Sequence, residues 1–146
     1  SKLLSHKKRK LWSDWIYAHA LSTGLDWVWN EDIDRINILQ ATRRAMIGAV
    51  RRIGLEIGHL LIDGPITLEL PIPQSSIIKG DRKSLSIAAA SVIAKVLRDD
   101  LMEQMAFHFP DFDLQKNRGY PTQKHRDVLS CLGLSIYHRK SFFRKG

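Results

Sequence analysis

The sequence predicts an α/β fold, in which helices pack against a sheet. Two short apolar runs, residues 59–62 and 76–78, have the composition of buried strands, and each stops at a turn-forming segment. Segments with apolar residues at helical spacing lie before and after these runs. Strands that alternate with helices are typical of layered α/β architectures.

Length and composition indicate one globular domain that spans residues 1–146. The chain has 146 residues, of which 44% are hydrophobic and 26% charged, without an internal repeat or a low-complexity linker. Its 23 Lys and Arg against 15 Asp and Glu leave a formal charge of +8. This charge suits nucleic acid or an anionic membrane surface, and by itself it does not choose between them.

Cysteine usage and hydropathy indicate a reducing, cytoplasmic setting. Cys131 has no second cysteine with which to form an internal disulfide, and no signal segment opens the chain. No apolar run approaches the roughly 20 residues that span a bilayer. We therefore expect a cytoplasmic protein with no membrane partner.

The first predicted helix has Ser5 as its candidate N-cap and continues to about residue 21. Leu11, Trp15 and Ala18 recur at helical spacing, which predicts that they share the inward face. The outward face is expected to carry the basic residues Lys7, Lys8, Arg9 and Lys10.

A strand and a divided helical stretch are expected next. Residues 25–29 have the β-branched and aromatic bias of a strand, and a short helical turn is expected from Asn30. A longer amphipathic helix begins at Asn37 and exposes a basic face. Its apolar positions recur at helical spacing, at Ile38, Ala41, Ala45, Met46, Ala49 and Ile53.

The two central strands are followed by the longest predicted helix. Residues 59–62 are halted by Asp63-Gly64-Pro65, and residues 76–78 stop at Lys79-Gly80-Asp81. The stretch from about Ser84 to Phe107 has too many apolar positions for one narrow stripe. It is therefore expected to be a central helix packed against the sheet.

The C-terminal part is predicted to be irregular at first and then helical. Residues 109–119 show no regular pattern, whereas Pro121-Thr122 starts a helix that continues to about Leu132 and stops at Gly133. The tail over residues 137–145 mixes basic and aromatic side chains.

Asp63 and Asp81 are candidate metal ligands. Each follows a strand-like run, a placement that would put both carboxylates at the ends of neighbouring strands. Magnesium takes a few carboxylate ligands and keeps several waters, so such aspartates suit two-metal cleavage of a phosphodiester. The same spacing fits Asp63 in a common turn and residues 79–82 in a solvated loop. The residues alone leave both interpretations open.

Tyr120 lies in a tight loop just before a helix N-terminus, in Gly119-Tyr120-Pro121-Thr122. Backbone N–H groups there favour a phosphate, and the ring is placed to stack on a sugar or base. Alternatively, Tyr120 closes the edge of the core and Thr122 only caps the helix. Zinc-ligand spacing, a nucleophile elbow and phosphate-loop patterns do not occur in the sequence, which argues against these site classes.

Together these segments resemble ribonuclease HII, a metal-dependent endonuclease, along nearly the whole chain. The resemblance is specific because many short motifs recur in the family's order and spacing. They are Ser1-Lys2-x-Leu4-Ser5, Ile33-Asp34-x-x-Asn37-Ile38-Leu39-x-Ala41-Thr42-x-x-Ala45-Met46, Leu61-Ile62-Asp63-Gly64, Lys79-Gly80-Asp81, Ser86-Ile87-Ala88-Ala89-Ala90-Ser91-Val92-Ile93-Ala94-Lys95-Val96-x-Arg98-Asp99, Gly119-Tyr120-Pro121-Thr122-x-x-His125 and His138-Arg139-x-Ser141-Phe142.

The resemblance implies a ribonuclease H-like fold, with a mixed central sheet flanked by helices and a helical C-terminal part. Asp63 and Asp81 match the family's third and fourth metal-binding carboxylates, which are catalytic and hold Mg²⁺ or Mn²⁺. Tyr120 matches the tyrosine that packs against the sugar beside the ribonucleotide. Asp99 falls in the family's Arg-Asp pair and is expected to form a helix-surface or structural ion pair with a neighbour. The other expected substrate contacts are Lys2, Ser5, Asn37, Lys79, Thr122, Arg139 and Lys140, of which Lys79 is equally suited to offset nearby carboxylate charge.

The resemblance also implies an endonuclease activity, and it indicates that a catalytic segment of the family does not occur in this sequence. The family cuts 5′ to a ribonucleotide, in RNA/DNA hybrids or in DNA with embedded ribonucleotides, and the intact enzyme is expected to be a monomer. Its first two carboxylates lie in an Asp-Glu-x-Gly-Arg-Gly segment on N-terminal strands that this sequence lacks. With two of the four carboxylates, the chain alone is expected to be weak or inactive. The alternatives are a non-catalytic nucleic-acid-binding relative and a fragment that needs a separate N-terminal piece.

Overall fold

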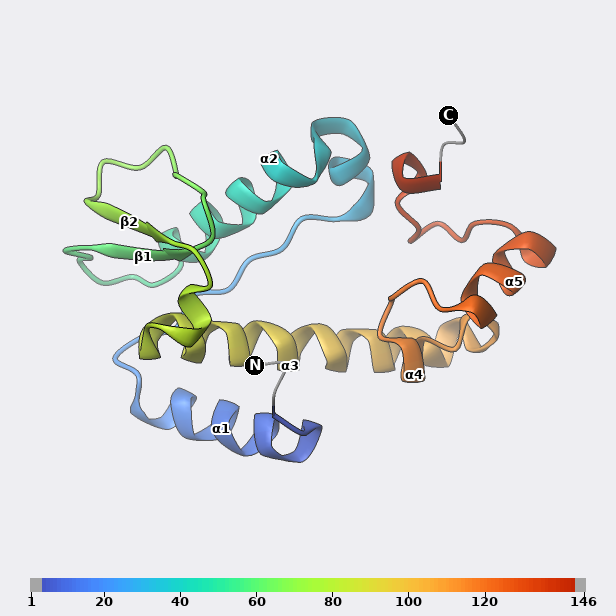
Figure 1. Cartoon of the computed structure of the whole chain (residues 1–146), viewed down its shortest axis with the longest axis horizontal. Coiled ribbons are helices and arrows are strands. Elements are labelled where there is room, and N and C mark those ends of the chain that lie inside the picture. The colour runs from blue at the N-terminus through green and yellow to red at the C-terminus, as the bar shows by residue number, and fades with distance from the viewer. Residues whose placement is uncertain (1–3, 144–146) are drawn as a thin grey trace.

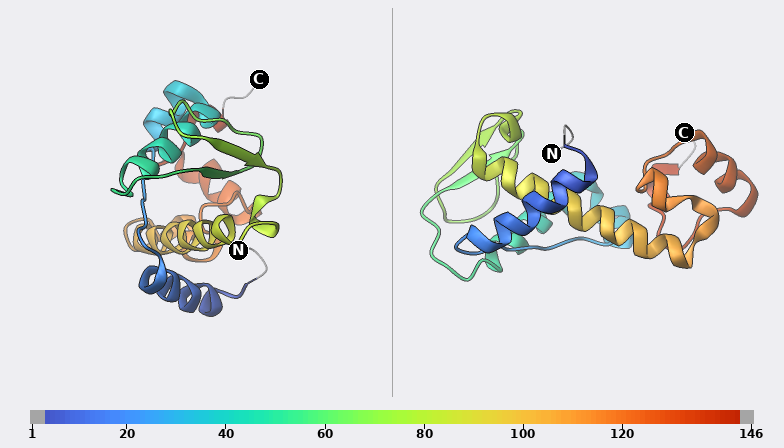
Figure 2. Two further views of the ribbon diagram at one scale, coloured as in Figure 1. Left: turned by 90° about the vertical axis from the view of Figure 1, so that its left-hand side faces the viewer. Right: turned by 90° about the horizontal axis from the view of Figure 1, so that it is seen from below.

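The computed structural model describes residues 4–143, which form a layered α/β arrangement around one long helix. In chain order the elements are α1 (His6–His19), α2 (Asn30–Arg51), β1 (Leu60–Asp63), β2 (Gln74–Ile77), the 3₁₀ turn η1 (Gly80–Arg82), α3 (Leu85–His108), η2 (Pro110–Phe112), α4 (Leu114–Asn117), α5 (Gln123–Leu132) and η3 (Lys140–Phe143). Helix α3 crosses the molecule, with α1 along one side and the strands and α2 on the other (Figures 1 and 2). The C-terminal elements gather at the far end of α3 (Figure 1).

The described sheet consists of two parallel strands, β1 and β2, which pair in register along their whole length. Leu60 and Ile62 are buried with Leu68 in a core cluster that packs against α2. Leu61 and Asp63 alternate to the opposite face. The predicted α/β class is confirmed. The resemblance implied a mixed sheet, whereas the two described strands run parallel. Strand β2 begins and ends earlier in the sequence than the predicted run at residues 76–78.

Helix α3 is the predicted central helix. It begins after Ser84, whose Oγ accepts a hydrogen bond from Ile87 N at 3.5 Å. Ile87, Val92, Ile93 and Val96 are buried along it. Because α3 contacts β1 and η1 near its start and α1 along its side, its apolar positions face more than one neighbour. This explains why they exceed a single stripe.

The predicted inward face of α1 is wrong. Leu11 and Trp15 are exposed by 62% and 53%, whereas Ser13 is buried. Arg9, expected to point outward, turns toward α3 and pairs with Asp99 there at 3.4 Å. The α1–α3 contact therefore includes an ion pair, and it lies on a face of α1 other than the one that the periodicity favours.

The predicted strand at residues 25–29 is also wrong. This segment has no regular secondary structure and pairs with no strand among residues 4–143. Trp27 and Trp29 remain exposed by 61% and 49%. Strand propensity mostly reflects packing against neighbouring strands, and the described chain places none beside this segment.

Asn37 divides α2 where the sequence predicts a helix start. Its φ of 67° and ψ of 165° are not helical, so α2 consists of two helical parts separated by a kink. The Asn37 Oδ1 accepts hydrogen bonds from Leu39 N at 3.0 Å and Gln40 N at 3.1 Å. The side chain thus caps the second part of the helix.

Helix α5 begins and ends as predicted. Thr122 Oγ1 accepts a hydrogen bond from His125 N at 3.2 Å, and Gly133 follows the helix with a φ of 76°. Of the helices within the described part of the chain, none combines the length and the apolar character of a membrane span.

Two side chains in the first part of α2 hold the C-terminal tail. Asn30 Nδ2 donates to two backbone carbonyls of residues 136–138, at 2.8 Å and 3.2 Å. Asp34 accepts hydrogen bonds from Lys140 N at 2.8 Å, from Ser141 N at 2.9 Å and from the Ser141 hydroxyl. These contacts fix the tail against α2, although the residues are far apart in the sequence.

Candidate active site

Asp63 ends β1 on the face that points away from the core cluster. Leu60 and Ile62 occupy the other face, so strand alternation places the Asp63 side chain at the surface. Its Oδ1 accepts a hydrogen bond from Gly80 N at 2.7 Å. The chain that follows β2 therefore orients one oxygen of the β1 carboxylate.

Asp81 lies in η1, the turn that follows β2. Lys79 has a left-handed φ of 56° and turns the chain from the strand into η1. Gly80 is buried, and a Cβ added to it would lie 3.3 Å from Asp63 Oδ1, tighter than most such contacts. The glycine therefore allows the Asp63 carboxylate to approach the backbone directly before Asp81.

Asp63 and Asp81 offer hard oxygen donors of the kind that Mg²⁺ and Mn²⁺ bind. Among residues 4–143, no group of three or more His, Cys, Asp or Glu side chains is arranged to hold a metal ion. The two carboxylates thus fit a divalent cation as part of a ligand set. Water, substrate or further protein oxygens must complete that set.

Tyr120 is 52% exposed, and Lys95 Nζ lies 5.7 Å from the centroid of its ring. A ring so exposed does not close the edge of the core. On α3, Ile87 packs against Gly80 and Lys95 reaches Tyr120, and this stretch of helix is roughly 12 Å long. Gly80, which lies next to the Asp63 carboxylate and directly before Asp81, and the ring of Tyr120 thus both lie beside α3.

The remaining predicted substrate contacts fall into three groups. Lys2 lies outside the described residues. The side-chain oxygens of Ser5, Asn37 and Thr122 cap α1, the second part of α2 and α5, so each already accepts a backbone hydrogen bond. Lys79 is exposed at the turn before η1. The substrate roles of these residues stay predictions.

Arg139 is half-buried in a groove of about 800 Å³ between residues 25–30, α3 and the C-terminal tail. Its guanidinium carbon lies 4.0 Å from the ring centroid of Phe142. Its predicted contact with phosphate stays a prediction, and Lys140 beside it is exposed.

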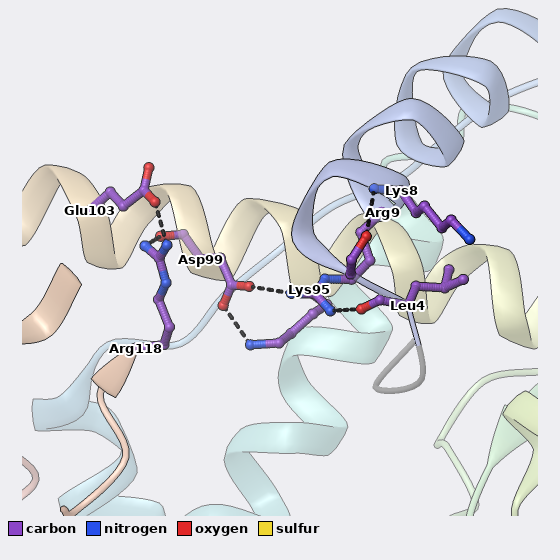
Figure 3. A network of polar contacts seen from close by, with 8 residues as sticks. Leu4, Lys8, Arg9, Lys95, Asp99, Glu103 and Arg118 are labelled. Carbon is purple, nitrogen blue, oxygen red and sulfur yellow. Dashed lines mark hydrogen bonds and ion pairs between the residues drawn. The ribbon is translucent and has the colours of Figure 1, made fainter. Parts of the chain in front are cut away.

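Asp99 is the buried centre of an ion-pair network (Figure 3). The residue is 1% exposed, and its carboxylate pairs with Arg9 of α1 at 3.4 Å and with Lys95 one turn earlier on α3. Arg118 donates to the Asp99 backbone carbonyl at 3.3 Å and pairs with Glu103. The network ties α1 and the segment before α5 to α3. The ion pair expected for Asp99 is therefore confirmed, and it is buried rather than on the helix surface.

The sequence of the chain is similar to those of known proteins. The family model described as Ribonuclease HII matches residues 1–145. The chain belongs to the ribonuclease HII family. A Bacillus cereus protein named Ribonuclease HII is 45% identical over 142 residues, which are 97% of this chain and 55% of that protein. A Bacillus cytotoxicus protein of the same name is 44% identical over 142 residues, 97% of this chain and 54% of its own length. The chain thus spans about half the length of the ribonuclease HII relatives that it matches.

Two residues of the ribonuclease HII motifs have surroundings that local sequence patterns do not reveal. Asp34 accepts hydrogen bonds from a tail 106 and 107 residues away. Arg98 lines the same groove as Arg139. Both lie in segments that resemble the family, Ile33-Asp34 and Val96-x-Arg98-Asp99, and this position in a motif is the one signal that the sequence offers.

A hydrogen-bond relay through His138 and His125 stabilises the C-terminal part. Ser135 N donates to His138 Nδ1 at 3.0 Å, so His138 carries its proton on Nε2. That atom lies 3.2 Å from His125 Nε2, which must accept; His125 Nδ1 then donates to Phe112 O at 3.2 Å. The hydrogen bond from Ser135 N thus requires that Nδ1 of His138 carries no proton.

The chain is expected to lose stability as the pH falls from about 7.5 to about 5.5. Burial lowers the pKa of His138 from its ordinary value of 6.5, and repulsion from the neighbouring His125, when that ring is protonated, lowers it further. A lowered folded-state pKa gives a contribution that is present above the unfolded value and lost as pH falls through the folded value. The unfolding midpoint of His138→Asn should therefore change less between these pH values than that of wild type. The exposed His108→Asn should behave as wild type, and an undiminished pH dependence in His138→Asn would contradict the relay.

Proposed function

We propose that this chain supplies two catalytic carboxylates, Asp63 and Asp81, to an endonuclease that hydrolyses the phosphodiester 5′ to a ribonucleotide. The substrates are RNA/DNA hybrids and DNA with embedded ribonucleotides. The hydrogen bond from Gly80 N to Asp63 Oδ1 at 2.7 Å carries the proposal, because it draws the β1 carboxylate to the turn that bears Asp81. Membership of the ribonuclease HII family supports the class of reaction.

Each residue has a distinct part in the proposed reaction. Mg²⁺ or Mn²⁺, when bound by Asp63 and Asp81, supplies an activated water and charge stabilisation at the phosphate. Tyr120 packs against the sugar beside the cut, and the charges of Lys79 and Arg139 attract neighbouring phosphates. The products are a 3′-hydroxyl and a 5′-phosphate. We propose that the intact enzyme acts as a monomer in the cytoplasm.

Cleavage of a duplex that contains a single ribonucleotide, with Mn²⁺ present, tests this function. We expect little or no cleavage by the chain of 146 residues alone, because two carboxylates cannot hold both the attacking and the leaving oxygen. Adding a polypeptide that carries the family's Asp-Glu-x-Gly-Arg-Gly segment should start cleavage 5′ to the ribonucleotide. An all-DNA duplex of the same sequence is the control. Robust cleavage by the chain alone would contradict the expected weakness; an inactive mixture would count against the proposed function.

A second candidate function is binding of nucleic acid without cleavage. Two observations favour it: residues 4–143 hold no group of three or more side chains suited to a metal ion, and the chain has a formal charge of +8. A chain that binds the ribonucleotide-containing duplex, yet supports no cleavage after the N-terminal polypeptide is added, would support this alternative.

A further inference from the structure

We infer that Arg98 and Arg139 together form a binding site for one backbone phosphate of the nucleic acid, beside the loop that carries Tyr120. The inference deepens the proposed function and rests on it, because the ligand is a phosphate of the proposed substrate. The sequence suggests Arg139 as a separate phosphate contact and assigns no role to Arg98.

Both arginines line one groove of about 800 Å³. Its walls are residues 25–30, the middle of α3 and the C-terminal tail, which lie around one region of the molecule (Figure 1). Apolar side chains such as Trp29, Leu97 and Leu101 make up much of these walls. Charges interact more strongly beside such apolar surroundings than they do in open water.

The Arg98 guanidinium lies against the loop that carries Tyr120. A Cβ added to Gly119 would lie 3.3 Å from Arg98 Nη2. Gly119 has a φ of 76°, so the loop needs a glycine at this position and leaves its backbone open to the guanidinium. Within residues 4–143, the Arg98 side chain has no hydrogen bond or ion pair. Its N–H donors are therefore available to a ligand.

Arg139 is held in place by its neighbours. Asp34 accepts hydrogen bonds from the backbone N–H groups of Lys140 and Ser141, at 2.8 Å and 2.9 Å, and so fixes the residues that follow Arg139. The guanidinium carbon lies 4.0 Å from the Phe142 ring centroid. Contact with a ring through the guanidinium face leaves the N–H donors at its edge available for oxygen ligands.

The two positive charges act on one another. Burial lowers the pKa of the Arg139 guanidinium, the charge of Arg98 lowers it further, and Asp34 opposes both effects. Two like charges in a partly apolar groove repel, and an anion bound between them would remove this repulsion. A ligand with negative oxygens therefore fits this part of the groove.

Two carboxylates also line the groove, those of Asp26 and Asp100. Asp26 pairs with Arg52 at 3.2 Å. Asp100 lies two positions after Arg98 on α3, and helix positions with this spacing are turned by about 200° from one another. Guanidinium groups bind phosphate oxygens through paired N–H donors, and the phosphates of the proposed substrate supply such oxygens.

Binding of a fluorescein-labelled RNA/DNA hybrid to the full chain, followed by anisotropy at several salt concentrations, tests the site. We expect Arg98→Gln and Arg139→Gln each to weaken binding by about tenfold, the effect of losing a charge-assisted contact. The double variant should lose less than the product of the two single effects, because both side chains hold the same phosphate. In the double variant, the slope of log affinity against log salt concentration should decrease by the amount expected for one lost phosphate contact, and not for two.

Arg51→Gln is the matched control. Arg51 is the last residue of α2 and is exposed, and its replacement removes the same charge. That end of α2 lies beside the strands, away from the C-terminal tail (Figure 1). It should weaken binding by less than about threefold, through general charge attraction. The unfolding midpoint of Arg98→Gln should equal or exceed that of wild type, because repulsion between like charges is relieved; a structural role for Arg98 would lower it.

The outcomes separate the inference from the proposed function. If wild type binds the hybrid and both groove variants bind as Arg51→Gln does, the phosphate site is wrong and the proposed function stands. If the affinity loss of the double variant equals the product of the two single losses, the two arginines do not share one phosphate, and the inference is wrong. If wild type binds no duplex at all, the proposed function fails, and the inference fails with it.

Discussion

Replacing Asp63 by asparagine is expected to lower ribonucleotide-directed cleavage by at least about 100-fold. Metal ions contribute several kcal/mol of charge stabilisation in such reactions, and about 1.4 kcal/mol corresponds to a tenfold change in rate. Asparagine keeps an oxygen that can accept the hydrogen bond from Gly80 N, at 2.7 Å in wild type, but it removes the negative charge. The local fold should therefore persist while the cation loses a ligand. The measurement is the cleavage rate with Mn²⁺ in a mixture of this chain and a polypeptide that carries the Asp-Glu-x-Gly-Arg-Gly segment.

Asp14→Asn, on an exposed position of α1, is the matched control and should cleave at the wild-type rate. Calorimetric titration with Mn²⁺ provides a second readout, in which Asp63→Asn and Asp81→Asn should both bind the ion more weakly than wild type. Cleavage at the wild-type rate by Asp63→Asn would remove this residue from the active site and with it the central claim of the proposed function.

Replacing Asp99 by alanine is expected to lower the free energy of unfolding by about 3 kcal/mol. The Asp99 side chain is 2% exposed, and the side chains of its partners Arg9 and Lys95 are 12% and 19% exposed. Its removal leaves two poorly solvated positive charges without the carboxylate that they share. Urea unfolding followed by circular dichroism measures the change.

Asp100→Ala tests whether the effect belongs to the buried network. Asp100 is the next residue of α3 and is more exposed than Asp99, so its loss should cost less than about 0.5 kcal/mol. Adding Arg9→Met to Asp99→Ala should restore part of the stability, because one of the two unpaired charges is removed. If Asp99→Ala and Asp100→Ala lower the free energy of unfolding equally, the ion pairs of Asp99 add no stability beyond that of an aspartate at this part of α3.

Helix ends were predictable from the sequence because capping is a local interaction. Ser5, Ser84 and Thr122 each accept a hydrogen bond from the backbone N–H three residues later, and the sequence places all three at helix starts. Asn37 was recognisable in the same way, although the structure shows it as a kink inside α2. Such interactions depend on neighbours in the chain, so a sequence pattern records them.

The buried face of α1 and the segment at residues 25–29 show where local patterns fail. Periodicity identifies which residues share a helix face, but not which face meets a neighbour. Arg9 pairs with Asp99, 90 residues away, on the side of α1 that meets α3, whereas Leu11 and Trp15 of the apolar stripe stay exposed. A strand likewise needs a partner strand, which residues 25–29 do not meet within the described chain.

The candidate site combines both kinds of information. The sequence by itself determined that Asp63 and Asp81 each follow a strand, that Tyr120 precedes a helix and that the motifs are those of ribonuclease HII. Only the tertiary structure decided that Gly80 N donates to the Asp63 carboxylate, that Arg9 of α1 pairs with Asp99 of α3, and that Arg98 and Arg139 share a groove. These contacts join residues that the chain brings together only when its helices and strands pack, and packing geometry leaves no local trace in the order of amino acids.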